Sequence, residues 1–349
     1  MQTPPAKSRH ILVMRLSAMG DVAMCVPVVA QLRRELPGYK ITVLTRRKFQ
    51  IFFRDIPDIE FFTPDFDGAH KGLAGLWRLA RELSEAGVDA VMDLHDVLRT
   101  QLLRLFLVLR GKRVARVEKG RLDKRALTRR FRKIRVHLTP TVERYRQAFT
   151  RLGLKLAEPA VPPREPRPLP EAAAALTGPK EGVWIGVAPF AQHKGKVYPT
   201  ILTDALIGLL AERFGRVFVF GGGEYEMAFA ECMEQRHKGT TSVIGRLGLG
   251  EEMDLISNLD CMVTMDSASM HIASLVATPV VSIWGATHPY AGFYGFGQNP
   301  DDAVQLDLPC RPCSVYGNRP CIYRDYRCLA NIPPTTVLEQ VTAVIGRNR

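Results

Sequence analysis

Residues 260–289 contain side chains whose types and spacing suit a phosphorylated sugar. Residues 267–269 (Ser-Ala-Ser) are small and lie at the expected start of a helix. Backbone N–H groups without intrahelical partners and the helix dipole attract an anion such as phosphate there. Asp266 precedes them, and its carboxylate suits sugar hydroxyl groups better than phosphate. A structural interpretation fits equally well, with Asp266 as a helix N-cap and His271 as a buried, hydrogen-bonded histidine.

This stretch is expected to form a βαβ unit that places its polar residues at one edge of a sheet. Residues 260–264 (DCMVT) and 279–284 (PVVSIW) are short apolar runs typical of buried strands, and the segment between them begins with N-cap residue types. The loop after the second strand carries Thr287 and His288. Ligands of open α/β sheets bind at the carboxyl ends of the strands, so we expect both turns to face the ligand.

The sequence D-S-A-S-M-H at residues 266–271, followed by a strand and by G-A-T-H-P, resembles the signature of glycosyltransferase family nine, the heptosyltransferases of lipopolysaccharide assembly. The resemblance implies an α/β architecture called the GT-B fold, in which two Rossmann-like domains face each other across a cleft. It also implies transfer of a sugar from a nucleotide donor with inversion and without a metal. The family more often has glycine at the position of Ala268, so a methyl group narrows the expected phosphate pocket here.

Residues 17–21 (SAMGD) resemble the N-terminal motif of the family, whose aspartate is the proposed general base, and that role carries over to Asp21. A sugar hydroxyl is a poor nucleophile, and a positioned carboxylate can accept its proton during the attack. Asp21 could instead only cap the helix that follows. Ser17, Gly20 and His95 are expected to contact the acceptor, although His95 could equally be a loop residue without a role.

The resemblance also assigns donor contacts in the second half of the chain. In the family a lysine shortly before an aromatic–proline pair binds the donor phosphates, which matches Lys196 in K-V-Y-P, with Lys194 as the near alternative. A fixed positive charge there would stabilise the departing diphosphate without a metal. In the family a ribose-binding acid follows a glycine turn. Residues 221–223 match that turn, although they could also be only a tight turn. Glu226 matches the acid, and Glu224 is a weaker candidate. The complete set of expected donor contacts is Lys194, Lys196, Glu226, Asp266, Ser267, Ala268, His271 and Thr287.

The positive charge of the chain is concentrated in one segment. Residues 99–135 contain fifteen lysines and arginines against two acids, an excess equal to the net charge of +13 of the whole chain. Such a block indicates an anionic partner. Residues 119–135 have apolar side chains at roughly helical spacing, which suits an amphipathic segment on a membrane surface.

From this charge we expect residues 99–135 to contact the cytoplasmic leaflet of the membrane peripherally. Arg121 and Arg125 are expected to bind an anionic glycolipid acceptor, because guanidinium groups suit phosphate. Nucleic acid is the alternative partner. It is disfavoured because Phe131 is the lone aromatic residue of 119–135 that could stack on bases.

The seven cysteines fall into two groups. Three lie in apolar segments and are expected to be inert core thiols: Cys25, Cys232 and Cys261. The other four follow the pattern C-x2-C-x7-C-x6-C, in which the first pair has zinc-ribbon spacing and the second does not: Cys310, Cys313, Cys321 and Cys328. We favour reduced structural thiols, with zinc binding as the alternative.

A segment rich in proline and alanine predicts an interdomain linker at residues 158–182. The linker divides an N-terminal acceptor-binding domain (1–157) from a C-terminal nucleotide-sugar-binding domain (183–333). A terminal helix (334–349) completes the chain and, by analogy with GT-B folds, is expected to pack back onto the first domain. Residues 22–36 are expected to be helical, with Pro27 near the start or at a kink. The chain shows neither an apolar run of membrane-spanning length nor a signal peptide, which predicts a cytoplasmic protein.

These features favour an inverting glycosyltransferase that moves heptose from ADP-heptose to a lipopolysaccharide core or a related glycolipid. One alternative is a sugar-nucleotide epimerase or hydrolase on the same fold, which would release product without an acceptor. A second alternative is a basic lipid- or nucleic-acid-binding protein on a decayed transferase fold. It would bind polyanions in a salt-sensitive way and turn over no nucleotide sugar.

Overall fold

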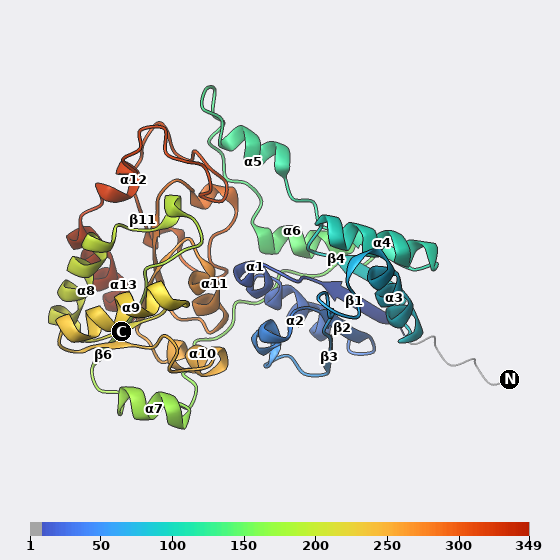
Figure 1. Cartoon of the computed structure of the whole chain (residues 1–349), viewed down its shortest axis with the longest axis horizontal. Coiled ribbons are helices and arrows are strands. Elements are labelled where there is room, and N and C mark those ends of the chain that lie inside the picture. The colour runs from blue at the N-terminus through green and yellow to red at the C-terminus, as the bar shows by residue number, and fades with distance from the viewer. Residues whose placement is uncertain (1–8, 349) are drawn as a thin grey trace. The chain divides into compact units, whose positions relative to one another are not determined.

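A computed structural model describes residues 9–348, which form two α/β units (Figure 1). The first unit comprises the chain up to Lys119 together with residues 141–160. The second comprises residues 120–140 and the chain from Val161 onward. This division differs from the linker-based one, because residues 120–140, which carry much of the basic block, pack with the second unit.

The first unit is built on a five-stranded parallel sheet with the strand order β3-β2-β1-β4-β5. Its strands are β1 (His10–Met14), β2 (Lys40–Leu44), β3 (Ile59–Phe62), β4 (Ala90–Asp93) and β5 (Arg113–Arg116). β1 and β4 are buried along their whole length, as expected for central strands covered on both faces. The chain order reverses between β1 and β4, which makes that junction the switch point of the sheet.

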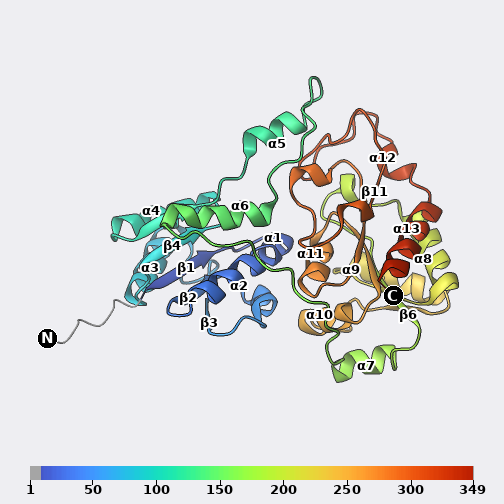
Figure 2. The same cartoon turned by 180° about the vertical axis from the view of Figure 1, so that it is seen from behind.

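Helices cover both faces of this sheet. They are α1 (Met19–Ala23), α2 (Val26–Glu35), α3 (Gly72–Glu85), α4 (Leu98–Leu109) and α6 (Thr141–Ala148), with short 3-10 turns at Arg47–Phe53 and Phe149–Leu152. α3 and α4 lie side by side and bury Leu76, Leu83 and Leu107 against the sheet (Figures 1 and 2). α2 contacts α6.

The second unit contains a six-stranded parallel sheet with the strand order β11-β10-β9-β6-β7-β8. Its strands are β6 (Val183–Ala188), β7 (Gly215–Val219), β8 (Thr240–Ser242), β9 (Cys261–Met265), β10 (Val280–Trp284) and β11 (Ala303–Gln305). The switch point of this sheet lies between β6 and β9. Its helices are α5 (Arg121–Leu127), α7 (Glu171–Thr177), α8 (Thr200–Phe214), α9 (Glu224–Arg236), α10 (Leu249–Ser257), α11 (Ala268–Leu275), α12 (Arg327–Ala330) and α13 (Pro334–Arg347).

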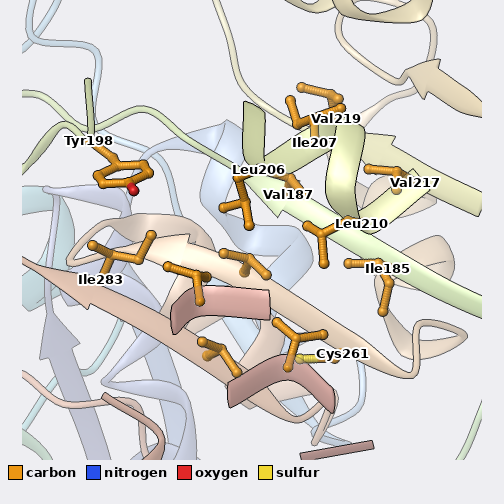
Figure 3. Close-up of a cluster of buried hydrophobic side chains, with 14 of the residues drawn as sticks. Ile185, Val187, Tyr198, Leu206, Ile207, Leu210, Val217, Val219, Cys261 and Ile283 are labelled. Carbon is orange, nitrogen blue, oxygen red and sulfur yellow. The ribbon is translucent and has the colours of Figure 1, made fainter. Parts of the chain in front are cut away.

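The core of the second unit explains where the terminal helix lies. Side chains of β6, β7, β9 and β10 meet side chains of α8 in one apolar cluster (Figure 3). Val337, Val341 and Val344 of α13 belong to the same cluster. The terminal helix thus uses its apolar face within the second unit, and its expected contact with the first domain stays a prediction.

The structure adds detail to several local expectations. The segment 22–36 forms two helices, α1 and α2, with Pro27 at the second position of α2, where the missing N–H costs nothing. The expected linker contains α7. Of the basic segment 119–135, only α5 is helical, and α9 follows the glycine turn without having been predicted. Within residues 9–348, no helix combines the length and apolarity needed to cross a bilayer.

Candidate functional site

The predicted site residues gather at the switch points of the two sheets. In the first unit, the loop after β1 carries Ser17 and leads to Asp21, and the loop after β4 carries His95. In the second unit, the loop after β6 carries Lys196, and Asp266 follows β9. Because the connections after two neighbouring strands leave to opposite faces of the sheet at a switch point, a crevice forms outside the carboxyl ends of these strands, and ligands bind there. Each unit therefore has the place for one ligand.

In the first unit, Asp21 is held by a buried arginine. The Arg15 guanidinium lies 2.6 Å from Asp21 Oδ2, and the Ala18 N–H donates to the same oxygen at 3.3 Å. Arg15 also donates to the Leu94 carbonyl at 2.5 Å. Burial works against the charge of Arg15, but Tyr145 and Asp21 raise its pKa above the ordinary value, so it stays protonated. The side chain of Asp21 is 28% exposed, which leaves it accessible to a substrate.

Ser17 and His95 form the second contact at this edge. Ser17 Oγ lies 3.3 Å from His95 Nε2, across the switch point between the loops after β1 and β4. Burial, reinforced by the positive charges of Arg15 and Lys119, lowers the pKa of His95 to about 3. The imidazole is therefore neutral near neutral pH and serves as a hydrogen-bonding group. Gly20 lies in α1, where its carbonyl accepts the N–H of Met24.

A cavity of about 580 Å³ opens beside this pair. Its polar side is formed by Ser17, His95, Arg46 and Arg99, and its apolar side by leucines of α3 and α4. Asp93 fixes the backbone of the loop that carries His95, because one carboxylate oxygen of Asp93 accepts the N–H groups of His95 and Asp96, both at 2.9 Å. The cavity can hold a ligand with both an anionic and an apolar part.

In the second unit, the decisive contact joins Lys196 to Asp266. Lys196 Nζ lies 2.8 Å from Asp266 Oδ2, and their side chains are 15% and 4% exposed. These residues are seventy positions apart in the chain and meet at the carboxyl ends of β6 and β9. Lys194 takes another direction, since its Nζ lies over the ring of Tyr326 at 5.4 Å. The geometry thus separates the two lysines that the sequence offered as alternatives.

Three loops hold Lys196 in place. The Gly195 carbonyl accepts the N–H of Ala286 at 2.8 Å, which ties the lysine loop to the loop after β10. A side chain at Gly195 would lie 2.7 Å from the Gly317 carbonyl, and one at Gly317 would lie 2.6 Å from Cγ of Lys196. Gly195 therefore approaches the backbone of Gly317, and Gly317 packs against the stem of Lys196, so glycine is required at both positions to seat the lysine.

Arg311 is a site residue that sequence reasoning missed. It is 2% exposed and donates to the carbonyls of Gly285 at 2.5 Å and Thr287 at 3.0 Å. Burial lowers its pKa to about 10, which still leaves it charged near neutral pH. Arg311 fixes the backbone of the loop after β10. No sequence pattern marks it, because its partners are carbonyl groups distant in the chain.

The turn before α11 presents polar groups that suit a phosphate. Ser267 is the N-cap residue of α11, and Ala268 is its first residue. Within the described part of the chain, the hydroxyl oxygens of Ser267 and Thr287 are buried without a hydrogen-bond partner. Buried hydroxyls without partners are costly, so they point to a ligand that completes them. His271 is buried on α11, as the structural interpretation expected.

The glycine turn before α9 positions Glu226. Its Oε2 accepts the N–H of Gly222 at 2.7 Å, and burial raises the pKa of Glu226 above its ordinary value. A side chain at Gly221 would lie 2.6 Å from the same oxygen, so the glycine makes room for the carboxylate. Glu224 is exposed at the first position of α9. Of the two acids, Glu226 is the one held in a defined orientation.

The basic residues chosen as acceptor contacts lie in the second unit. Arg121 and Arg125 belong to α5 and are exposed. The segment around them is attached to the second unit by Lys133, which donates to the carbonyls of Cys310 and Pro312 at 2.7 and 2.8 Å, and by Arg135, which pairs with Asp307 at 3.0 Å. Part of the basic charge is thus used in holding the segment.

The cysteines partly follow expectation. Cys25 and Cys261 are buried, and burial raises the pKa of both thiols to about 12. Cys232 is exposed on α9, so its assignment to the core was wrong. The four cysteines of the C-terminal pattern line one small cavity near α12 as free thiols. Among residues 9–348, no three or more histidine, cysteine or acidic side chains are grouped as a metal site.

Comparisons with known proteins find similar sequences and similar structures. The sequence model of glycosyltransferase family 9 (heptosyltransferase) matches residues 76–323. The lipopolysaccharide core heptosyltransferase OpsX of Haemophilus influenzae is 23% identical over 291 residues, which cover 80% of each chain. A family 9 glycosyltransferase from Veillonella parvula superposes with a TM-score of 0.73 at 17% identity, covering 99% of this chain and 100% of that one.

A third similarity is to the Escherichia coli heptosyltransferase WaaC solved with ADP. It superposes with a TM-score of 0.64 at 19% identity, covering 96% of this chain and 99% of that one. Similarity over whole chains at such low identity demonstrates a shared fold. The two parallel sheets with their helices are therefore the GT-B architecture that the sequence predicted.

Proposed function

Because the chain belongs to glycosyltransferase family 9, the heptosyltransferase family, we propose that it transfers heptose from ADP-heptose to a lipopolysaccharide core or a related glycolipid, with inversion. The observation that carries the proposal is the Lys196–Asp266 pair at the switch point of the second sheet. A buried lysine beside a helix N-terminus suits a diphosphate, and a carboxylate beside it suits the hydroxyls of the sugar. An adenine nucleotide is favoured because the WaaC relative was solved with ADP.

The second unit would bind the donor. An ammonium group has three N–H donors, so Lys196 can keep Asp266 as a partner and still hold a phosphate oxygen. Ser267, the backbone of Ala268 and Thr287 would complete the phosphate contacts, with His271 behind them, and Glu226 would accept the ribose hydroxyls. Lys194 would play a lesser part, since it is directed at Tyr326.

The first unit would bind the acceptor and supply the base. Asp21 would accept the proton of the acceptor hydroxyl while its oxygen attacks the anomeric carbon. The bond from that carbon to the diphosphate oxygen breaks on the opposite face, and the diphosphate leaves with its negative charge stabilised by Lys196. Lys196 supplies the charge that a metal supplies in other transferases, so we propose that none is needed. Ser17, Gly20 and His95 would orient the acceptor.

The basic block would bring the enzyme to its acceptor. Arg121 and Arg125 are exposed and can contact phosphates of the glycolipid. We propose that residues 99–135 contact the inner face of the cytoplasmic membrane, since each basic side chain near an anionic leaflet contributes about 1 kcal/mol. The protein would then work in the cytoplasm as a peripheral membrane enzyme.

The test is a donor panel followed by transfer. Unfolding temperatures are measured with ADP, UDP, GDP and ADP-heptose; a ligand at roughly 100 times its dissociation constant adds about 2.7 kcal/mol to stability. We expect a selective response to ADP and ADP-heptose, and then transfer of labelled heptose to a heptose-deficient lipopolysaccharide acceptor. Selectivity for UDP or GDP would retain a glycosyltransferase but refute heptose from ADP-heptose.

A further inference from the structure

Helices α3 and α4 of the first unit expose a patch of large apolar side chains. Trp77 is 44% exposed, Leu98 72% and Leu109 67%. The full α3–α4 patch consists of Leu73 and Trp77 of α3 and Leu98, Leu105, Val108 and Leu109 of α4. Contiguous apolar surface of this kind on a folded protein marks an interaction site.

These residues form one surface because the two helices lie side by side. Trp77 meets Phe106 edge to face, with ring centroids 5.3 Å apart, and both views show α3 beside α4 (Figures 1 and 2). Each helix buries its other apolar face, with Leu79 and Leu103 in the core of the unit. The helices are therefore apolar on two sides, and the core accounts for one of them.

The border of the α3–α4 patch is basic. From residue 97 to residue 117 the chain has six lysines and arginines and no acid, although Arg104 and Arg116 pair with acids that follow β4 or end it. The guanidinium of Arg110 lies 4.7 Å from the ring of Trp77, and that of Arg99 lies 4.2 Å from the ring of Phe66. The two acids of α3 are already engaged, Glu82 by His70 and Glu85 by Arg81. Apolar side chains bordered by cations fit an anionic lipid surface.

The patch continues into the cavity beside the candidate base. Leu73 and Leu98 belong to the patch and also line the cavity, whose other wall is formed by Ser17 and His95. A lipid-linked molecule held at the patch could reach that wall without leaving the bilayer. The patch therefore connects a surface suited to lipid with the loop that leads to Asp21.

We propose that the α3–α4 patch inserts into the surface of an anionic phospholipid bilayer and presents the cavity mouth to the acceptor lipid. The delivery of acceptor rests on the proposed function; the membrane contact itself does not. A second copy of the chain is a poorer occupant, because a symmetric contact would set the two basic borders against each other. Trp77 at the border matches the place that tryptophan takes at membrane interfaces.

Trp77 provides a direct readout. The sequence has three tryptophans, and the other two, Trp184 and Trp284, are fully buried in the second unit. On mixing with vesicles of phosphatidylcholine and phosphatidylglycerol, we expect a blue shift of the emission and quenching by brominated lipid. Vesicles of phosphatidylcholine alone should bind more weakly, and added salt should weaken the anionic binding. An unchanged emission with bound vesicles would overturn insertion at the patch.

Paired variants locate the contact. Leu105→Ser with Leu109→Ser removes two exposed leucines outside the cavity, and we expect vesicle affinity to fall at least about tenfold. The comparison variant is Leu122→Ser with Phe131→Ser, at 81% and 75% exposed positions in the other part of the basic segment, and we expect it to lose less affinity than the patch variant. If the Leu122→Ser, Phe131→Ser variant lost vesicle affinity and the patch variant did not, the proposal would be overturned in favour of residues 120–140. Self-association of the wild type, relieved by the patch variant and unaffected by lipid, would overturn it in favour of a second copy.

The same variant separates this inference from the proposed function. With a water-soluble acceptor saccharide, the Leu105→Ser, Leu109→Ser variant should transfer heptose at the wild-type rate, while transfer to acceptor embedded in vesicles falls. Equal rates with embedded acceptor would refute the docking role alone. Absence of transfer by the wild type to either acceptor would refute the proposed function and leave the vesicle-binding result to decide the membrane contact.

Discussion

Removal of the Lys196 charge should destabilise the second unit by an amount set by the burial of its partner. Lys196→Met keeps the aliphatic stem that packs at Gly317 and removes the ammonium group 2.8 Å from Asp266. The Asp266 side chain is only 4% exposed, so water cannot replace the lost partner. Breaking a buried pair from one side costs about 3–5 kcal/mol. For a unit of this size that is a fall of on the order of 10 °C in unfolding temperature.

A double variant separates stability from binding. Lys196→Met with Asp266→Asn removes both charges, so no buried carboxylate remains unpaired, and we expect it to recover most of the lost stability. If Lys196 binds the donor diphosphate, the double variant should still fail to bind ADP. The matched control is Lys194→Met, an exposed lysine two residues away that faces Tyr326; it should leave stability unchanged and weaken ADP binding much less than Lys196→Met.

The assay follows the second unit by its own tryptophans. Trp184 of β6 and Trp284 of β10 are fully buried there, whereas Trp77 belongs to the first unit. In a Trp77→Phe background, the fluorescence change on heating or in urea reports the second unit alone. ADP affinity is measured by calorimetry on the same proteins.

Two results would refute this reasoning. Unfolding of Lys196→Met at the wild-type temperature would mean that the ion pair contributes nothing to the second unit. Recovery of ADP affinity in the double variant would mean that Lys196 acts only by neutralising Asp266, and the phosphate-binding role would be lost.

Two further predictions concern pH and the glycine turn. Burial lowers the pKa of His95 to about 3, whereas an unfolded histidine titrates near ~6.5, so below that pH the unfolded state binds the extra proton. The stability contributed by neutral His95 is therefore fully present above a pH of about 6.5. It is lost as the pH falls toward about 3, by up to ~1.4 kcal/mol per pH unit. His95→Gln should flatten the pH dependence of unfolding of the first unit, and an unchanged slope would contradict the burial argument. Gly221→Ala would place Cβ 2.6 Å from Glu226 Oε2 and should weaken ADP binding roughly tenfold. The control variant Gly222→Ala, whose Cβ meets nothing within 4 Å, should bind ADP normally. Equal ADP affinities of the two variants would remove Glu226 from the site.

Much of the architecture was accessible from sequence because the central strands of parallel sheets are continuous apolar runs. β9 and β10 are buried from end to end and were predicted near their observed bounds, and the central strands β1 and β6 are buried in the same way. Polar residues directly after such runs had to lie at the ligand-binding edge. Asp266 was found in this way, and the resemblance to glycosyltransferase family nine added Asp21 and Lys196, which lie in the loops after β1 and β6.

The features that were missed depend on contacts distant in the chain. The motif favoured Lys196 over Lys194 without excluding the latter, and the contact with Asp266 after β9 distinguishes the two lysines. Arg311 carries no motif, since its partners are carbonyl oxygens of another loop. Residues 128–135 have apolar spacing that fits a helix, but Lys133 and Arg135 hold this segment in an irregular path on the second unit.

The pairing of Asp21 with Arg15 leads to the last prediction, because a general base held by a cation must still have a free oxygen. Arg15 and the Ala18 N–H both contact Oδ2 of Asp21, and within residues 9–348 no hydrogen bond reaches Oδ1. We infer that Arg15 is a positioning residue that turns Oδ1 toward the acceptor. Asp21→Asn keeps the shape and removes the proton acceptor, so turnover should fall roughly 100- to 10,000-fold with donor affinity intact.

Arg15→Met should release the carboxylate instead of removing it. Asp21 is 28% exposed, so water can solvate it, and the stability loss should be about 1 kcal/mol, smaller than at Lys196. Turnover should fall less than in Asp21→Asn, with kcat lowered and the KM for donor unchanged. Arg15→Lys retains a charge near Asp21 but loses the fixed contact with Leu94, so it should recover only part of the rate. Full activity in Arg15→Met would show that Asp21 needs no orientation, whereas a loss equal to that of Asp21→Asn would make the pair one functional unit.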